Sequence, residues 1–169
     1  MTYFAKTAMI LSICYYCIIL GILWIGQILG VHNGIWEAFD FPQQDTSPPV
    51  WTLIIGLIMT GTALCYLASA YRAAWTILGG GPKQDFRDLG QNLKRMAWGL
   101  IGFWVGYNLV SGVMQYLIII GLPSTDGFEF GWDPLDLDII FAIVGVVLLA
   151  ISQTLERAWL AEDENSQFL

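Results

Sequence analysis

The hydrophobic residues of this chain are grouped in four long runs, and the shorter segments between the runs hold nearly all of the charged residues. The runs cover approximately residues 8–31, 50–71, 97–122 and 137–155. A helix needs roughly 20 residues to cross ~30 Å of hydrocarbon. The pattern therefore predicts an all-α integral membrane protein, in which residues 1–169 form a single domain of four transmembrane helices.

Turn-forming residues mark the ends of the predicted spans. Ser47 and Pro48 are typical of a helix start, because the hydroxyl accepts a free backbone N–H and proline loses nothing at the first helical position. We therefore expect the second helix to begin near Val50, and the glycines at 79–81 to end it. Asp133, followed by a proline, predicts the start of the fourth helix in the same way.

The segment between the second and third runs, residues 72–96, carries five of the seven basic side chains. Residues 32–49 and 123–136, by contrast, hold acidic residues and no Lys or Arg. Lys and Arg near the ends of spans stay on the cytoplasmic side of a membrane. Four spans with both termini in the cytoplasm place every basic residue on that side: Lys6, Arg72, Lys83, Arg87, Lys94, Arg95 and Arg157.

The overall composition agrees with this class of protein. Hydrophobic residues make up 56% and charged residues 12% of the chain, against about 25% charged residues in soluble domains. The net charge of −7 is divided among separate segments, so it says little about partners. We expect no direct binding of nucleic acid. The four-span topology places most tryptophans near one of the two membrane surfaces, as aromatic belts require: Trp24, Trp36, Trp51 and Trp132 outside, and Trp75, Trp98 and Trp159 inside.

The basic segment and the tail differ from ordinary connections between spans. After Pro82, hydrophobic residues recur every three or four positions, which predicts a cytoplasmic helix at the membrane interface before the third span. This stripe consists of Phe86, Leu89, Leu93 and Met96. The tail, residues 156–169, begins with Glu156 and Arg157 and then turns acidic. A basic segment and an acidic tail are therefore expected on the same side of the membrane.

The third predicted span carries hydrogen-bonding side chains on one helical face, at Asn108, Ser111 and Gln115. Lipid cannot satisfy them, so we expect them to hold neighbouring helices together or to line a small polar cavity. Small residues on three of the spans allow close approach of backbones. They are Gly26 and Gly30 on the first, Gly56, Thr60 and Gly61 on the second, and Gly99, Gly102, Gly106 and Gly112 on the third.

Candidate reactive groups are few. Cys14 and Cys17 form a CxxC, and Cys65 is predicted at a similar depth, but a CxxC within hydrocarbon lacks the context of a redox or zinc site. His32 is the single histidine and lies outside the spans, which argues against haem and multi-histidine metal sites. The spans contain no internal Asp, Glu, Lys or Arg, so a proton-coupled transporter is not favoured either. We expect no enzymatic activity, no cofactor and no metal.

The order of features resembles the bacterial membrane family known as domain of unknown function 2975. The resemblance rests on a glycine break after the second span, on R-D-L-G-x-N-L-K-R at 87–95, on L-E-R-A-x-L-A-E-D-E at 155–164 and on the terminal Q-F-L. It implies a multi-pass protein of the bacterial inner (plasma) membrane without known activity. Members are often encoded near small helix-turn-helix regulators, which implies a regulatory or sequestering role.

These observations predict a regulatory or accessory protein that binds a protein partner through its cytoplasmic face. The basic segment and the tail offer apolar anchors beside charges, the usual composition of an interface. The candidate partner-binding residues are Arg72, Phe86, Arg87, Leu89, Leu93, Lys94, Arg95, Trp159 and Phe168. The alternative is a peripheral subunit of a larger membrane complex that binds lipid or another lipophilic small molecule. In both cases membrane lipid surrounds the protein, and the partner protein contacts it in the cytoplasm or within the membrane.

Overall fold

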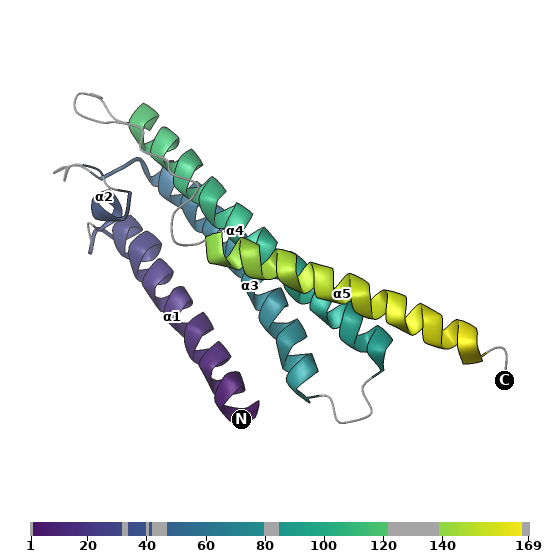
Figure 1. Cartoon of the computed structure of the whole chain (residues 1–169). Helices are drawn as coiled ribbons and strands as arrows, with labels where there is room; N and C mark the ends of the chain where they lie inside the picture. The colour runs from purple at the N-terminus through teal and green to yellow at the C-terminus, as the bar shows by residue number, and fades with distance from the viewer. Residues whose placement is uncertain are drawn as a thin grey trace.

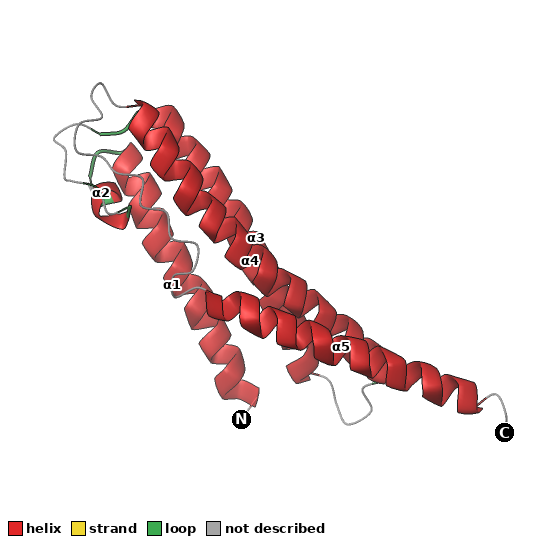
Figure 2. Cartoon of the chain, turned by 45° about the horizontal axis from the view of Figure 1, so that its top comes forward, coloured by secondary structure: helices red, strands yellow, loops and turns green. Residues whose placement is uncertain are grey.

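The computed structural model describes residues 2–31, 34–39, 41, 47–79, 85–121 and 139–166, and in these residues all regular structure is helical (Figures 1 and 2). The helices are α1 (Thr2–Ile28), α2 (Ile35–Ala38), α3 (Val50–Gly79), α4 (Phe86–Gly121) and α5 (Ile139–Ser166). All except the short α2 are long and apolar enough to cross a membrane. The predicted helical class is confirmed, and the four helices are compatible with a multi-pass membrane protein.

The long helices pack in the order in which they follow one another in the chain. The closest pair is α3 and α4, which run antiparallel; α5 packs on α4, and α1 packs on α3 (Figure 1). Small residues set the distance between α3 and α4. A Cβ added at Gly99 would lie 2.7 Å from the Ala70 Cβ, and one added at Gly106 would lie 3.1 Å from the Ala63 Cβ. The backbones of the two helices are therefore closer than larger side chains would permit.

The helix boundaries agree in part with those predicted. The second long helix begins at Val50 and ends at Gly79, the first of the three glycines expected to end it, so it extends eight residues past the predicted end of the span at residue 71. The Ser47 hydroxyl accepts a hydrogen bond from Nε2 of Gln27, at 3.2 Å, and the first turn of α3 closes on the Pro49 carbonyl instead. The predicted start of the fourth helix at Asp133 lies outside the described residues.

One boundary differs in a way that matters for the site. We expected a cytoplasmic interfacial helix followed by a separate third span from residue 97, whereas α4 runs without a break from Phe86 to Gly121. No proline interrupts this stretch, and Asp85 caps its first turn: Arg87 N donates to Asp85 Oδ1 at 3.4 Å, and Leu89 N donates to the Asp85 carbonyl. All positions from 86 to 121 therefore share one helical phase.

The end of the structure predicted to face the exterior is filled with large side chains. Trp24, Trp36, Met114 and Ile118 are almost fully buried there. The segment around α2 belongs to the acidic connection 32–49, which the predicted topology places outside the membrane, and its aromatic residues lie in this core. Trp36 was assigned to a membrane-surface belt and is 0% exposed. The complete cluster is Trp24, Ile35, Trp36, Phe39, Phe41, Leu53, Val110, Met114 and Ile118.

A hydrogen bond across two helices fixes the position of Trp24 in this filled end. The indole Nε1 donates to Oγ1 of Thr60 on α3 at 3.1 Å, and both residues are buried. The ring covers Gly56, where any Cβ would overlap it. Trp24 of the first predicted span thus contacts Gly56 and Thr60, two of the small residues noted on the second.

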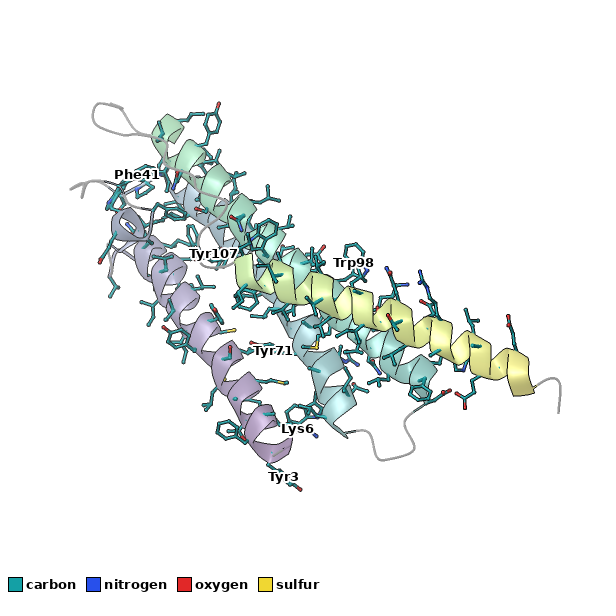
Figure 3. The ribbon with its side chains drawn as sticks, viewed as in Figure 1. Tyr3, Lys6, Phe41, Tyr71, Trp98 and Tyr107 are labelled. Atoms are coloured by element: carbon teal, nitrogen blue, oxygen red, sulfur yellow. The ribbon has the colours of Figure 1, made fainter. Side chains whose placement is uncertain are left out.

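The opposite half of the structure has a core of smaller side chains. Its buried cluster consists of Ala63, Leu67, Ala70, Leu100 and Phe103. Phe103 joins three helices, because its ring meets those of Tyr16 on α1 and Phe141 on α5 edge to face, with centroids 5.9 and 5.1 Å apart. Tyr71 points from α3 towards α1 (Figure 3), and its hydroxyl pairs with that of Ser12 at 3.0 Å.

The outer faces of α1 and α5 are hydrophobic and exposed. In α1 only 6% of the most apolar 18 residues are buried, against 33% in α3. Exposed apolar helix faces of this length are compatible with contact to lipid. The exposed positions include Ile10, Leu11, Ile18, Ile22 and Ile25 on α1 and Ile140, Ile143, Val146, Val147 and Ile151 on α5.

Candidate binding site at the basic end of α3 and α4

The single helical phase of α4 places basic and aromatic side chains of its first three turns on one face. Arg87, Gln91, Lys94 and Trp98 follow one another at spacings of four, three and four residues, and so lie along one line of the helix. Arg95 neighbours this line. Arg87 lies in the first turn of α4, at the positive end of the helix dipole, which adds to the positive potential there.

Helices α3 and α5 complete a cavity around this face. From α3 come Tyr66, Ser69, Arg72, Ala73 and Thr76, again at helical spacings. The cavity has a volume of about 880 Å³, and four of its lining side chains are cationic while one is a carboxylate. The remaining lining residues are Arg87, Gly90, Gln91, Asn92, Lys94, Arg95, Trp98 and Gly99 from α4 and Glu156 and Trp159 from α5.

The contact of α4 with α5 closes one side of the cavity. Gly90 allows the close approach: a Cβ there would lie 3.5 Å from the Ser152 carbonyl oxygen. One turn earlier, the Arg87 guanidinium lies over the Trp159 ring, 5.0 Å from its centroid. This cation–π contact holds Arg87 beside the last turns of α5, because a guanidinium cation is attracted to the face of an indole ring.

A second, apolar hollow continues along α3 and α4 from the cavity. It has a volume of about 500 Å³, and Tyr66 and Trp98 line both spaces. Trp98 projects outward from α4, on the side away from α1 (Figure 3). The one polar side chain besides Tyr66 and Trp98 is Thr62, whose hydroxyl donates to the Ile58 carbonyl of its own helix. The other lining residues are Ile58, Met59, Ala63, Ile101, Gly102, Val105, Gly106 and Leu109.

The predicted partner-binding residues are distributed over this region. Arg72, Arg87, Lys94, Arg95 and Trp159 line the cavity together. Leu89 and Leu93 are half-buried and do not line it, whereas Phe86 is 47% exposed at the start of α4. The described residues do not include Phe168, Lys83, His32 or the acidic segment 123–136.

The predicted polar stripe of the third span divides in the structure. Asn108 donates from Nδ2 to the Trp104 carbonyl of its own helix, at 2.9 Å. Gln115 is 6% exposed, and among the described residues its Oε1 has no hydrogen-bond partner. Ser111 is half-buried. The described hydrogen bonds between long helices come from other residues, Trp24 with Thr60 and Ser12 with Tyr71.

The three cysteines are free and exposed, Cys14 and Cys17 on α1 and Cys65 on α3. In the described part of the chain, His, Cys, Asp and Glu form no group of three that could hold a metal ion. The cavity therefore depends on cationic and aromatic side chains for its chemistry, which suits the binding of an anion.

The cavity residues that were not among the predicted partner-binding residues include Tyr66, Gln91, Trp98 and Glu156. Gln91 and Trp98 belong to the same helical line as Arg87 and Lys94, so extending the interfacial helix into the third span would have revealed them. Tyr66 and Glu156 lie on other helices, and no local pattern places them near α4.

Comparisons of the chain with protein-family models, curated proteins and solved structures find no match. The resemblance to domain of unknown function 2975 stays a prediction. The fold and the site define the chain as an all-helical protein with four membrane-length helices and a cation-lined cavity at one end.

Proposed function

We propose that this chain is a non-enzymatic protein of the bacterial inner membrane that binds a partner protein through its cytoplasmic face. The observation that carries the proposal is a pair of exposed apolar residues at the basic end. Phe86 is 47% exposed and precedes Arg87 in the sequence, and Leu160 is 48% exposed and follows Trp159. Arg87 and Trp159 contact each other. Apolar anchors surrounded by charges are the usual composition of an interface.

The last turns of α5 support the same proposal. Trp159 of α5 lies next to Arg87, which is near the start of α4. Residues 160–166 of α5 therefore extend beyond the start of α4 (Figure 2). Glu162 and Glu164 are exposed on this extension. A helix that projects beyond its neighbours with one apolar and several acidic side chains offers a partner both contact area and charge. The resemblance named above makes a small helix-turn-helix regulator a suitable partner, held at the membrane and away from DNA.

A photocrosslinking experiment tests the proposed surface. Benzoylphenylalanine at Leu160 should yield a defined protein adduct in living cells, and Phe86→Ser should abolish that adduct without lowering the amount of membrane-inserted protein. Val31 is the matched control, because it is an exposed apolar residue at the other end of the structure. Equal adducts from both positions, or an adduct at Leu160 that survives Phe86→Ser, would contradict the proposal.

The proposed orientation has its own test. In a variant with serine at all three native cysteine positions, a single cysteine at Val31 should react with a membrane-impermeant thiol reagent in intact cells. A single cysteine at Glu162 should react only after the membrane is opened, since both termini are proposed to be cytoplasmic. The reverse pattern of labelling would invert the topology and place the basic end outside.

A second candidate function, a lipid-binding subunit of a larger membrane complex, is favoured by the junction of the cavity with the apolar hollow. Tyr66 and Trp98 belong to both. A ligand that filled both spaces would have a charged part and a hydrocarbon part.

A further inference from the structure

We propose that the cavity and the apolar hollow form one binding site for an anionic phospholipid of the cytoplasmic leaflet. The phosphate-bearing headgroup occupies the cavity beside Arg72, Lys94 and Arg95, and one acyl chain lies in the hollow between α3 and α4. The inference rests on the second candidate function and on the proposed orientation, and it does not require the partner protein.

The charge of the cavity selects an anion. Cationic side chains converge on it from two helices, Arg72 from α3 and Arg87, Lys94 and Arg95 from α4, while Glu156 is the sole carboxylate among the lining residues. Like charges gathered in one concave space repel each other, and an anion in that space relieves the repulsion. Arginine also matches phosphate geometrically, with two parallel N–H donors.

The position of the cavity along the helices suits a headgroup. The predicted second span ends at residue 71 and the predicted third span begins at 97, so Arg72 and Arg95 are expected one and two residues outside the hydrocarbon. The packing of Gly99 on Ala70 places these two arginines at a common level on the antiparallel helices. Aromatic residues border the cavity on its membrane side, Tyr66 from α3 and Trp98 from α4, as is typical of the boundary between headgroups and hydrocarbon.

The length of the hollow suits one acyl chain. Its lining on α4 runs from Trp98 to Leu109, a distance of about 16 Å at 1.5 Å per residue. Half of the hydrocarbon thickness, the depth of one leaflet, is about 15 Å. Gly102 and Gly106 line the hollow, and their lack of side chains lets Tyr66 and Ala63 of α3 pack closely on α4. An apolar space of this length suits a hydrocarbon chain.

Binding to purified, delipidated protein in detergent tests the inference, with bound lipid counted by native mass spectrometry. The probes are dioleoyl phosphatidylglycerol, dioleoyl phosphatidylcholine with the same chains and no net charge, and glycerol 3-phosphate with the charge and no chains. Phosphatidylglycerol should bind in one-to-one stoichiometry and at least tenfold more tightly than either of the others. Equal binding of the two lipids would overturn the role of the cations, and equal binding of glycerol 3-phosphate would overturn the role of the hollow.

Matched substitutions locate the site. The double change Arg72→Gln and Lys94→Gln should weaken phosphatidylglycerol binding on the order of 30-fold, at about fivefold for each basic group near a lipid surface. Arg157→Gln is the charge control, because Arg157 is exposed on α5 and does not line the cavity. If Arg157→Gln weakens phosphatidylglycerol binding about fivefold, the amount expected for one cavity cation, the attraction is a general surface effect and the site is refuted.

A second pair of variants tests the hollow without altering any charge. Thr62→Phe should fill the hollow and weaken phosphatidylglycerol binding about tenfold, a loss of about 1.4 kcal/mol. Thr154→Phe is its control, since both threonines are exposed and donate to the carbonyl four residues earlier, and only Thr62 lines the hollow. Thermal unfolding in detergent without lipid verifies that each variant is folded. Unchanged binding by a folded Thr62→Phe variant would refute the acyl-chain position and leave the cavity to an acidic segment of a partner protein.

Discussion

The two ends of the helix assembly are built from side chains of different sizes. At the end predicted to be exterior, indoles and other large side chains fill the space between α1, α3 and α4, and the segment around α2 closes it. At the basic end, alanines and glycines bring α3 and α4 together, and a cavity of about 880 Å³ lies beside them. Both ends belong to the same long helices.

The difference separates the stabilising contacts from the binding surface. Burying large aromatic side chains contributes most to stability, and it leaves no room for a ligand. Small residues allow close helix packing and leave hollows along the outside of the pair. Arg72, Lys94 and Trp98 can therefore face a ligand while the opposite end holds the helices in register.

The largest expected effect comes from removing a tryptophan at each end. Trp24→Ala should lower the free energy of unfolding by about 3–5 kcal/mol, because Trp24 is 1% exposed and the space it leaves cannot collapse. Trp98→Ala should lower it by less than about 1 kcal/mol, since Trp98 is 56% exposed. Denaturant unfolding in lipid-free detergent measures both. Similar losses at the two sites would abolish the distinction between a filled and an open end.

The next effect concerns the helix contact at the basic end. Gly99→Ala should cost about 1–3 kcal/mol, because the new methyl group would lie 2.8 Å from the Ala70 backbone nitrogen and from the Tyr66 carbonyl oxygen. Gly61→Ala is the control: it is also a glycine within a long helix, and nothing lies within 4 Å of an added Cβ. The same unfolding assay compares them. Because alanine has a higher helix propensity than glycine, Gly61→Ala should leave stability unchanged or raise it slightly. An equal loss at both positions would show that the contact with Ala70 is not the cause.

A smaller effect tests the hydrogen bond of the filled end. Trp24→Phe and Thr60→Val each remove one partner of the 3.1 Å contact. In a double-mutant cycle the two should be coupled by about 0.6–1.7 kcal/mol, the range found for hydrogen bonds between membrane helices. The cycle is read from unfolding free energies of the four proteins. Additive single effects would mean that the bond contributes nothing beyond the packing of the ring.

The smallest effect is a gain. Gln115→Leu should raise the free energy of unfolding by about 1 kcal/mol, because Gln115 is buried and its Oε1 has no partner among the described residues. Asn108→Leu is the comparison, since Asn108 bonds its own helix and should change stability little. A clear loss from Gln115→Leu would assign the polar stripe of α4 to the joining of helices after all.

Local patterns accounted for most of the secondary structure. Four apolar runs predicted the four long helices, and the predicted start of α3 near Val50 is confirmed. The continuous α4 was missed because the composition changes from charged to apolar near Trp98 while the backbone conformation does not. A change of solvent from water to lipid alters which side chains are favoured, but it gives a helix no reason to end.

The sequence by itself determined the helical class, the membrane-length helices and the gathering of basic residues at one end, because each of these follows from residues close together in the chain. Only the tertiary structure decided that Trp36 is buried and that Tyr66, Trp98 and Glu156 share a cavity. Those facts depend on which helices pack together and at what distance. In this chain the distance between α3 and α4 follows from contacts such as Gly99 on Ala70, between residues far apart in the sequence, whose pairing no local periodicity records.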